Sequence, residues 1–126
     1  MKKNLRVLLV EDSETDALMI LRRLKEGGYD VEHERVETQK EFTTALAEHQ
    51  WDVILCDHIM PTFTGMKALY ILREKDDDTP FIFVSAMLGE NTAEQAKKAG
   101  ANDYVMKDDL KRLVSAVEAV LPKAVE

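Results

Sequence analysis

Five side chains of this sequence could together carry out phosphoryl chemistry, and they all follow short apolar runs. Glu11 and Asp12 come directly after LRVLLV, and Asp57 comes directly after VILC. Ser85 follows FIFV, and Lys107 follows DYVM. Carboxylate oxygens are ligands that suit Mg²⁺, with Mn²⁺ as an alternative, and the scattered histidines offer no zinc set. A carboxylate beside such a cation, with a lysine opposite, can act as a nucleophile toward a phosphoryl group.

Each of these residues also has an ordinary structural explanation. Asp57 could cap a helix or a turn, as could the Ser85 hydroxyl. Lys107 could be a solvated lysine at the end of a strand. The functional interpretation therefore depends on whether the fold brings all of them to one place.

The apolar runs are the elements that would do so. Leu5–Val10, Val53–Cys56, Phe81–Val84 and Asp103–Met106 are short and rich in apolar residues, as in strands buried on both faces of a parallel sheet. Val31–Val36 alternates apolar and polar residues, which predicts an edge strand. We therefore expect five strands.

Helical patterns separate these strands. The pairs Ser13–Asp16 and Thr38–Glu41 predict capping boxes that open the first two helices, and Leu18, Leu21 and Leu24 are expected to form the apolar face of the first. The remaining helices are predicted at Met66–Lys75, at Thr92–Ala99 and over a last segment in which Leu110, Leu113, Val114, Val117 and Leu121 recur at helical spacing.

This alternation predicts an α/β fold of the flavodoxin-like kind. We expect a five-stranded parallel sheet in the order 2-1-3-4-5, with helices on both faces. Glu11, Asp12 and Asp57 would then meet at the switch point between the first and third strands, on the same sheet edge as Ser85 and Lys107. Carboxylates about 4 Å apart repel each other by about 4 kcal/mol per pair at an effective dielectric of 20, and a divalent cation would relieve that repulsion.

Composition excludes several classes of protein. The chain has 126 residues, which suits a single domain, and its formal net charge of −7 leaves no basic patch for nucleic acid. No apolar run is long enough to span a membrane, and the N-terminal run is too short for a signal peptide. The single cysteine, Cys56, lies inside an apolar run and is expected to be buried. We therefore expect a cytoplasmic protein that binds neither membranes nor nucleic acid.

Taken in order, these residues resemble the receiver domain of two-component response regulators over essentially the whole chain. The matching positions are Glu11-Asp12, Asp57-x-x-Met60-Pro61-x-x-x-Gly65, Ser85-Ala86, Tyr104 and Lys107. The resemblance implies a single receiver domain over residues 1–126, of the chemotaxis type and without an effector domain.

The resemblance also implies roles. Asp57 would accept a phosphoryl group from a histidine kinase or phosphotransfer protein, and Lys107 and Ser85 would contact that group. Glu11, Asp12, Asp57 and the backbone carbonyl of Ile59 would hold Mg²⁺. Self-phosphorylation and slow autodephosphorylation would be the only reactions, so the chain would not be an enzyme in the ordinary sense.

Signalling would follow from a rearrangement of Ser85 and Tyr104. The hydroxyl would move toward the phosphoryl group and the ring would swing inward. A downstream protein, or a second copy of the chain, would then bind the face made by helix Thr92–Ala99, the fifth strand and the last helix.

Two features depart from the common pattern or modify it. The family's lysine is commonly followed by a cis proline, whereas Asp108 follows Lys107, so we expect a trans peptide bond. The residues two past the acceptor and two past the hydroxyl are Ile59 and Met87. Both are bulky and apolar, so they could exclude the hydrolytic water and prolong the phosphorylated state, or they could simply cover loop surface.

Three other functions compete with this interpretation. Phosphatases of the haloacid-dehalogenase type need a second acid two residues after the nucleophile, where this chain has Ile59. A flavodoxin-like cofactor carrier or a nucleotide-binding module would need a phosphate loop, but acids follow the first strand. A degenerate receiver that only binds partners is disfavoured because Asp57, Ser85 and Lys107 are all present.

Overall fold

Short apolar runs form the strands of the computed structural model, which describes residues 3–75, 77–86 and 91–122. The elements are β1 (Lys3–Val10), α1 (Glu14–Glu26), β2 (Tyr29–Val36), α2 (Gln39–Glu48), β3 (Val53–Cys56), α3 (Gly65–Glu74), β4 (Phe81–Ser85), α4 (Thr92–Lys98), β5 (Asp103–Met106), a 3₁₀ segment η1 (Lys107–Arg112) and α5 (Leu113–Val120). The predicted strands and helices are therefore confirmed, with boundaries shifted by one or two residues except at the start of the last helix.

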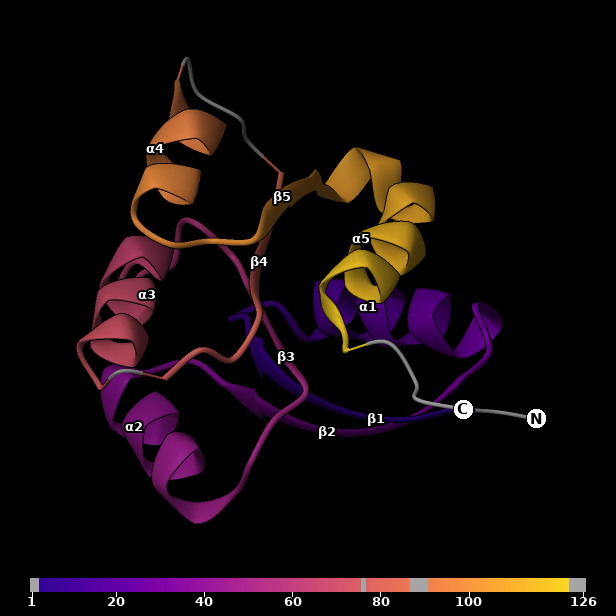
Figure 1. Ribbon diagram of the computed structural model, residues 1–126, viewed down its shortest axis with the longest axis horizontal. Helices are drawn as coiled ribbons and strands as arrows, with labels where there is room; N and C mark the ends of the chain where they lie inside the picture. The colour runs from indigo at the N-terminus through magenta and orange to yellow at the C-terminus, as the bar shows by residue number, and fades with distance from the viewer. Residues whose placement is uncertain (1–2, 76, 87–90, 123–126) are drawn as a thin grey trace.

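The five strands form one parallel sheet in the order β2-β1-β3-β4-β5. This is the predicted order, with β2 at an edge. Helices α1 and α5 cover one face of the sheet, and α2, α3 and α4 cover the other (Figure 1). Because all five strands are parallel, their carboxyl ends lie at one edge of the sheet.

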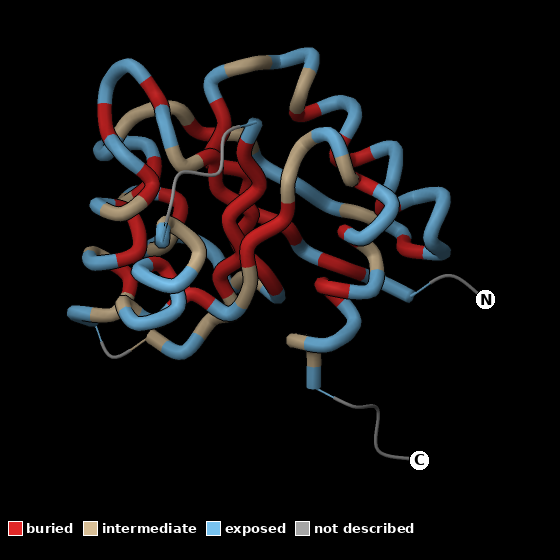
Figure 2. The backbone as a smooth tube through the Cα atoms, turned by 90° about the horizontal axis from the view of Figure 1, so that it is seen from above, coloured by how far each residue is buried: buried red, intermediate tan, exposed pale blue. Residues whose placement is uncertain are grey.

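Side-chain alternation along the strands divides the core into two layers. In β1, Leu5, Val7 and Leu9 pack toward α1 and α5, whereas Leu8 and Val10 pack toward α2 and α3. The sheet consequently forms the buried centre of the molecule, as the red segments in Figure 2 show. A sheet buried on both faces gives its strand ends a rigid base.

The two predicted capping boxes differ. Thr38 and Glu41 form a complete box, in which Glu41 Oε1 returns to the Thr38 N–H at 3.3 Å. At α1 the Ser13 hydroxyl accepts from the Asp16 N–H at 3.2 Å, but the Ser13 N–H donates to Glu11 Oε2 at 3.1 Å instead of to Asp16. The prediction of a full box at α1 was therefore wrong in its second half.

The predicted inward face of α1 also needs one correction. Leu21 and Leu24 are buried as expected, together with Ala17 and Ile20, but Leu18 is 61% exposed. At about 100° per residue, Leu18 lies outside the arc that the other four share. The leucine spacing was misleading because Ala17 and Ile20 complete the buried face.

The last helix begins later than its apolar spacing predicts. Residues Lys107–Arg112 form 3₁₀ turns broken at Asp109 (φ −132°, ψ 49°), and the α-helix starts at Leu113. Leu110 is nevertheless buried and packs into the core with residues of α1 and α5. The Lys107–Asp108 peptide bond is trans, as expected.

Candidate functional site

Four of the five strands place a polar side chain at the carboxyl edge of the sheet. The Glu11 N–H donates to the Val36 carbonyl at 3.0 Å, and the Asp57 N–H donates to the Val10 carbonyl at 2.8 Å. Ser85 is the last residue of β4, and Lys107 directly follows β5. Ladder hydrogen bonds thus continue to the site and fix the positions of Glu11 and Asp57.

The acidic residues form a cluster at this edge. Carboxylate oxygens of Glu11, Asp12 and Asp57 all lie within 4.8 Å of one another. Glu11 and Asp57 are buried, at 1% and 9% exposure, whereas Asp12 is exposed. The structure therefore brings together the three carboxylates that the sequence predicted.

Lys107 lies against this cluster. Its Nζ is 2.7 Å from Glu11 Oε1, 3.0 Å from Asp57 Oδ2 and 2.7 Å from Asp16 Oδ2. Burial lowers the pKa of Lys107, but its close contacts with the carboxylates of Asp16, Glu11 and Asp57 outweigh this effect and raise the pKa above its usual value. The lysine is therefore a fixed positive charge at this site.

Glu11 is the carboxylate most affected by its surroundings. Burial raises its pKa to about 7, although the Lys107 ammonium and the Ser13 N–H oppose the shift, and the nearby charge of Asp57 adds to it. Its Oε1 is buried and has no well-aligned hydrogen-bond donor among the described residues, because the Lys107 contact is an ion pair without that geometry. This oxygen keeps acceptor capacity for another positive group.

These donors fit a magnesium ion. All three side chains offer carboxylate oxygens; those of Glu11 and Asp57 are on buried residues, and that of Asp12 is on an exposed one. Such a set suits Mg²⁺, which binds one or two carboxylates and keeps several of its waters. For Ile59, the backbone N–H lies 3.4 Å from Asp57 Oδ1, so this part of the loop lies beside the acceptor carboxylate. The role of the Ile59 carbonyl stays a prediction.

The predicted rearranging pair, Ser85 and Tyr104, lies in contact and both residues are buried. Burial raises the pKa of Tyr104, and its hydrogen bond with Ser85 acts in the opposite direction. The tyrosine ring stacks on Phe83 at a centroid distance of 5.5 Å and is tilted against His58 at 6.1 Å. The ring is therefore directed inward in this structure.

The loop between Asp57 and α3 closes tightly on the strand end. The Gly65 N–H donates to the His58 carbonyl at 3.0 Å, and a Cβ on Gly65 would lie 2.5 Å from the Asp57 carbonyl oxygen and 2.6 Å from Phe83. A larger residue would push this loop off Asp57. The glycine of the motif thus has a packing reason.

The roles predicted for Ile59 and Met87 stay predictions. Ile59 is 59% exposed beside the site, which agrees both with exclusion of the hydrolytic water and with simple cover of the loop surface; Met87 lies outside the described residues.

The sequence analysis missed one residue of the site, because it interpreted Asp16 only as part of a helix cap. Its position three residues after Ser13 carried no signal for an ion pair with Lys107.

Comparisons with known proteins agree with this geometry. The sequence pattern of the response regulator receiver domain matches residues 7–118. The regulatory protein LuxO of Vibrio cholerae is 32% identical over 117 residues, which cover 92% of this chain and 25% of LuxO. The chemotaxis protein CheY of Bacillus subtilis is 29% identical over 117 residues, which cover 92% of this chain and 97% of CheY.

Solved structures show the same likeness. The receiver domain of the Francisella response regulator 1452 superposes with a TM-score of 0.81 at 28% identity, covering 93% of this chain and 96% of that domain. The chain spans only a quarter to about half of several curated relatives, among them LuxO and the regulator PcoR of Escherichia coli. Among the described residues, no helix combines the length and apolarity needed to cross a membrane.

Proposed function

Because this chain belongs to the response regulator receiver domain family, whose members take phosphoryl groups on an aspartate in phosphorelay signalling, we propose that Asp57 is its phosphoacceptor. One observation carries the proposal: the buried Asp57 carboxylate belongs to an acidic cluster that fits Mg²⁺ and also lies 3.0 Å from the Lys107 ammonium. No other described aspartate has both neighbours.

The residues divide the chemistry among them. An oxygen of Asp57 forms a bond to phosphorus while the P–N bond of a phosphohistidine breaks, and the leaving imidazole takes up a proton. Mg²⁺, held by Glu11, Asp12, Asp57 and the Ile59 carbonyl, would supply positive charge to the phosphoryl oxygens. Lys107 would exchange its contact with Asp57 for a phosphoryl oxygen, and the Ser85 hydroxyl would donate to another.

Receivers are not enzymes in the ordinary sense, since the modified residue is their own. We propose that this chain phosphorylates itself from small phosphodonors as well as from a histidine kinase or phosphotransfer protein. The covalent change adds about −1.5 to −2 charge and three acceptor oxygens beside Lys107 and Ser85.

Receiver domains interact with kinases or phosphotransfer proteins and with downstream targets. For this chain we propose that the downstream protein, or a second copy, binds the surface of α4, β5 and α5. Tyr104 supports this proposal, because it lies on β5 and contacts Ser85 at the site. A movement of the hydroxyl toward a phosphoryl group would change what holds the ring.

The test is phosphorylation by acetyl phosphate with Mg²⁺, followed by intact-mass spectrometry. Wild type should gain the mass of one phosphoryl group, and Asp57→Asn should gain none. Asp30→Asn is the matched control, because Asp30 is an exposed aspartate at the opposite end of the sheet, and it should be modified as wild type is. An adduct that persists in Asp57→Asn would refute the assignment.

A further inference from the structure

Asp16 contacts the functional lysine but lies outside the acidic cluster. Lys107 Nζ is as close to Asp16 Oδ2, at 2.7 Å, as it is to Glu11, yet among the described residues the carboxylates that could share a metal are Glu11, Asp12 and Asp57. We propose that Asp16 is a positioning residue, which holds the Lys107 ammonium at the site when Mg²⁺ occupies the other carboxylates. The proposal rests on the proposed function for its metal, but its contacts do not.

The local structure leaves the Asp16 carboxylate available for this contact. In α2, the equivalent Glu41 side chain returns to the backbone and completes the helix cap. In α1, the Ser13 N–H is already bonded to Glu11 Oε2. Asp16 has no cap to complete, so its side chain turns to Lys107.

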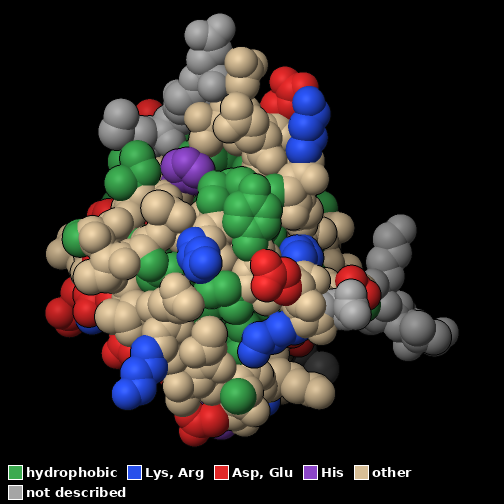
Figure 3. All heavy atoms as spheres, turned by 90° about the vertical axis from the view of Figure 1, so that its left-hand side faces the viewer, with side chains coloured by type: hydrophobic (Ala, Val, Ile, Leu, Met, Phe, Trp, Pro, Cys, Tyr) green, Lys and Arg blue, Asp and Glu red, His purple; other side chains and the backbone are tan. Residues whose placement is uncertain are grey.

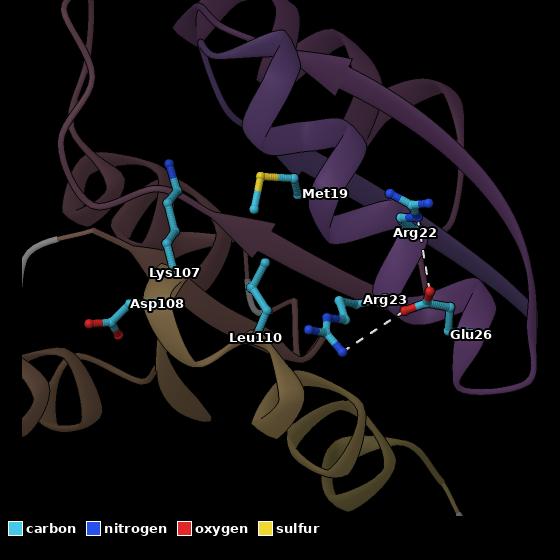
Figure 4. Close-up of a pocket in the computed structure, with 7 residues that line it drawn as sticks. All are labelled: Met19, Arg22, Arg23, Glu26, Lys107, Asp108 and Leu110. Atoms are coloured by element: carbon cyan, nitrogen blue, oxygen red, sulfur yellow. Dashed lines mark ion pairs between the residues drawn. The ribbon is translucent and has the colours of Figure 1, made fainter.

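Neighbouring cations do not compete for Asp16. A hollow of about 430 Å³ lies between α1 and η1, lined in part by Arg22, Arg23 and Lys107. The two arginines pair with Glu26, one turn further along α1. Figure 4 shows these ion pairs and the extended Lys107 side chain, whose ammonium end points away from Leu110. The Asp16 carboxylate is therefore left to Lys107.

Electrostatics explains why this contact matters. A bound divalent cation would take Glu11 and Asp57, two of the three carboxylates that now hold the ammonium, and it would repel the lysine as a like charge. Asp16 is the third partner and is not needed by the metal. Without it, Lys107 could stay at the site only by competing with Mg²⁺ for Glu11 and Asp57.

The first test follows the ammonium directly in protein saturated with Mg²⁺, because without the metal Glu11 and Asp57 would still hold Lys107. Nitrogen-15 NMR should detect the Lys107 ammonium as a slowly exchanging group in wild type and in Glu14→Gln. Glu14 is the matched control, since it is an exposed acid in the same first turn of α1. Asp16→Asn and Asp16→Ser should lose the signal, and Asp16→Glu should restore it in part. An unchanged signal in both neutral variants would overturn the proposal, even if Asp57 were never phosphorylated.

The second test measures Mg²⁺ affinity by calorimetry in a double-mutant cycle. Asp16→Asn should weaken Mg²⁺ binding about tenfold, which corresponds to about 1.4 kcal/mol, and Glu14→Gln should change it by about twofold or less because exposed charges are screened. In a Lys107→Met background, Asp16→Asn should act no more strongly than Glu14→Gln. An equal loss with and without Lys107 would show that Asp16 acts only through its charge and would overturn the proposal.

Discussion

A single ammonium group faces three carboxylates at the centre of this site. The sequence suggested that Glu11, Asp12 and Asp57 repel one another until a cation neutralises them. In the structure Lys107 already offsets part of that charge, with contacts of 2.7 to 3.0 Å. Metal binding would therefore relieve the repulsion among the carboxylates, and it would also take Glu11 and Asp57 away from Lys107. Substitutions of single residues can separate these two effects.

The raised pKa of Glu11 predicts how the metal-free protein responds to pH. Its folded pKa of about 7 lies above the ordinary 4.5, so the folded state binds more protons between these values. Stability should consequently fall as pH rises from about 4.5 to about 7 and stay lower above that range. Urea unfolding at several pH values measures this, and Glu11→Gln should flatten the slope. The exposed Glu34→Gln should keep it; an unchanged slope in Glu11→Gln would contradict the prediction.

The exposed side chain of Ile59 predicts a long-lived phosphoryl group. A bulky apolar residue beside Asp57 cannot orient the attacking water, and each 1.36 kcal/mol added to the barrier slows hydrolysis about tenfold. Ile59→Asn should lose phosphate several-fold faster than wild type, and Met87→Glu should act in the same direction. Leu18→Asn is the control, because Leu18 is similarly exposed on α1. Equal decay in all variants would place the control of lifetime elsewhere.

Among the elements, the loop from Asp57 to α3 is the one that fixes the acceptor. Thr64 caps α3 by accepting from the Lys67 N–H at 3.2 Å, and Gly65 packs against the backbone of Asp57 and His58. The helix start and the strand end are thus joined through one close backbone contact. The position of Asp57 depends on both.

Gly65→Ala should therefore disturb the site and the fold together. The new methyl would lie 2.5 Å from the Asp57 carbonyl oxygen, which cannot move without displacing the strand end. We expect a stability loss of about 1–3 kcal/mol and slower phosphorylation by acetyl phosphate. Gly27→Ala is the control: its methyl would also clash, at 2.7 Å from the Val114 side chain, but at the opposite end of the sheet from Asp57. If Gly65→Ala phosphorylated as fast as Gly27→Ala, the contact would not position Asp57.

At the scale of the whole molecule, the sheet edge connects the site to the surface beyond β4. Ser85 ends β4, and Tyr104 on β5 packs against Phe83 and contacts Ser85. Arg112 of η1 donates to the Tyr104 carbonyl at 2.7 Å and to Asp103 at 3.0 Å, which ties the start of α5 to the same strand.

Figure 3 shows the side of the molecule that α2, α3 and α4 form, where hydrophobic side chains gather among charged ones.

Activation should therefore change one side of the molecule more than the other. With a beryllofluoride salt and Mg²⁺ as a phosphoryl mimic, backbone NMR shifts should change at the sheet edge and across α4, β5 and α5. Helix α2 serves as the internal reference and should change little. A two-state bias of a few kcal/mol would be enough to alter partner binding. Shift changes confined to α2 and β2 would contradict the proposed binding face.

The amino-acid sequence by itself determined the architecture and the edge at which the site lies. Short buried runs between amphipathic segments are local patterns, and right-handed crossovers leave few ways to assemble them. Strand ends then follow from the runs, so Glu11, Asp12, Asp57, Ser85 and Lys107 could be placed at one edge before any coordinates. Their convergence is what the structure confirmed.

Only the tertiary structure showed the ion pair of Asp16 with Lys107, the exposure of Leu18 and the residue at which the last helix begins. An aspartate three residues after a serine gives the same signal whether it caps a helix or pairs with a lysine 91 positions away. Leu18 follows the leucine spacing, yet the buried arc is centred on its neighbours. Likewise, 3₁₀ and α turns place apolar residues three apart almost equally well, so the break at Asp109 left no mark. In each case a local pattern allowed two outcomes, and contacts between distant residues selected one.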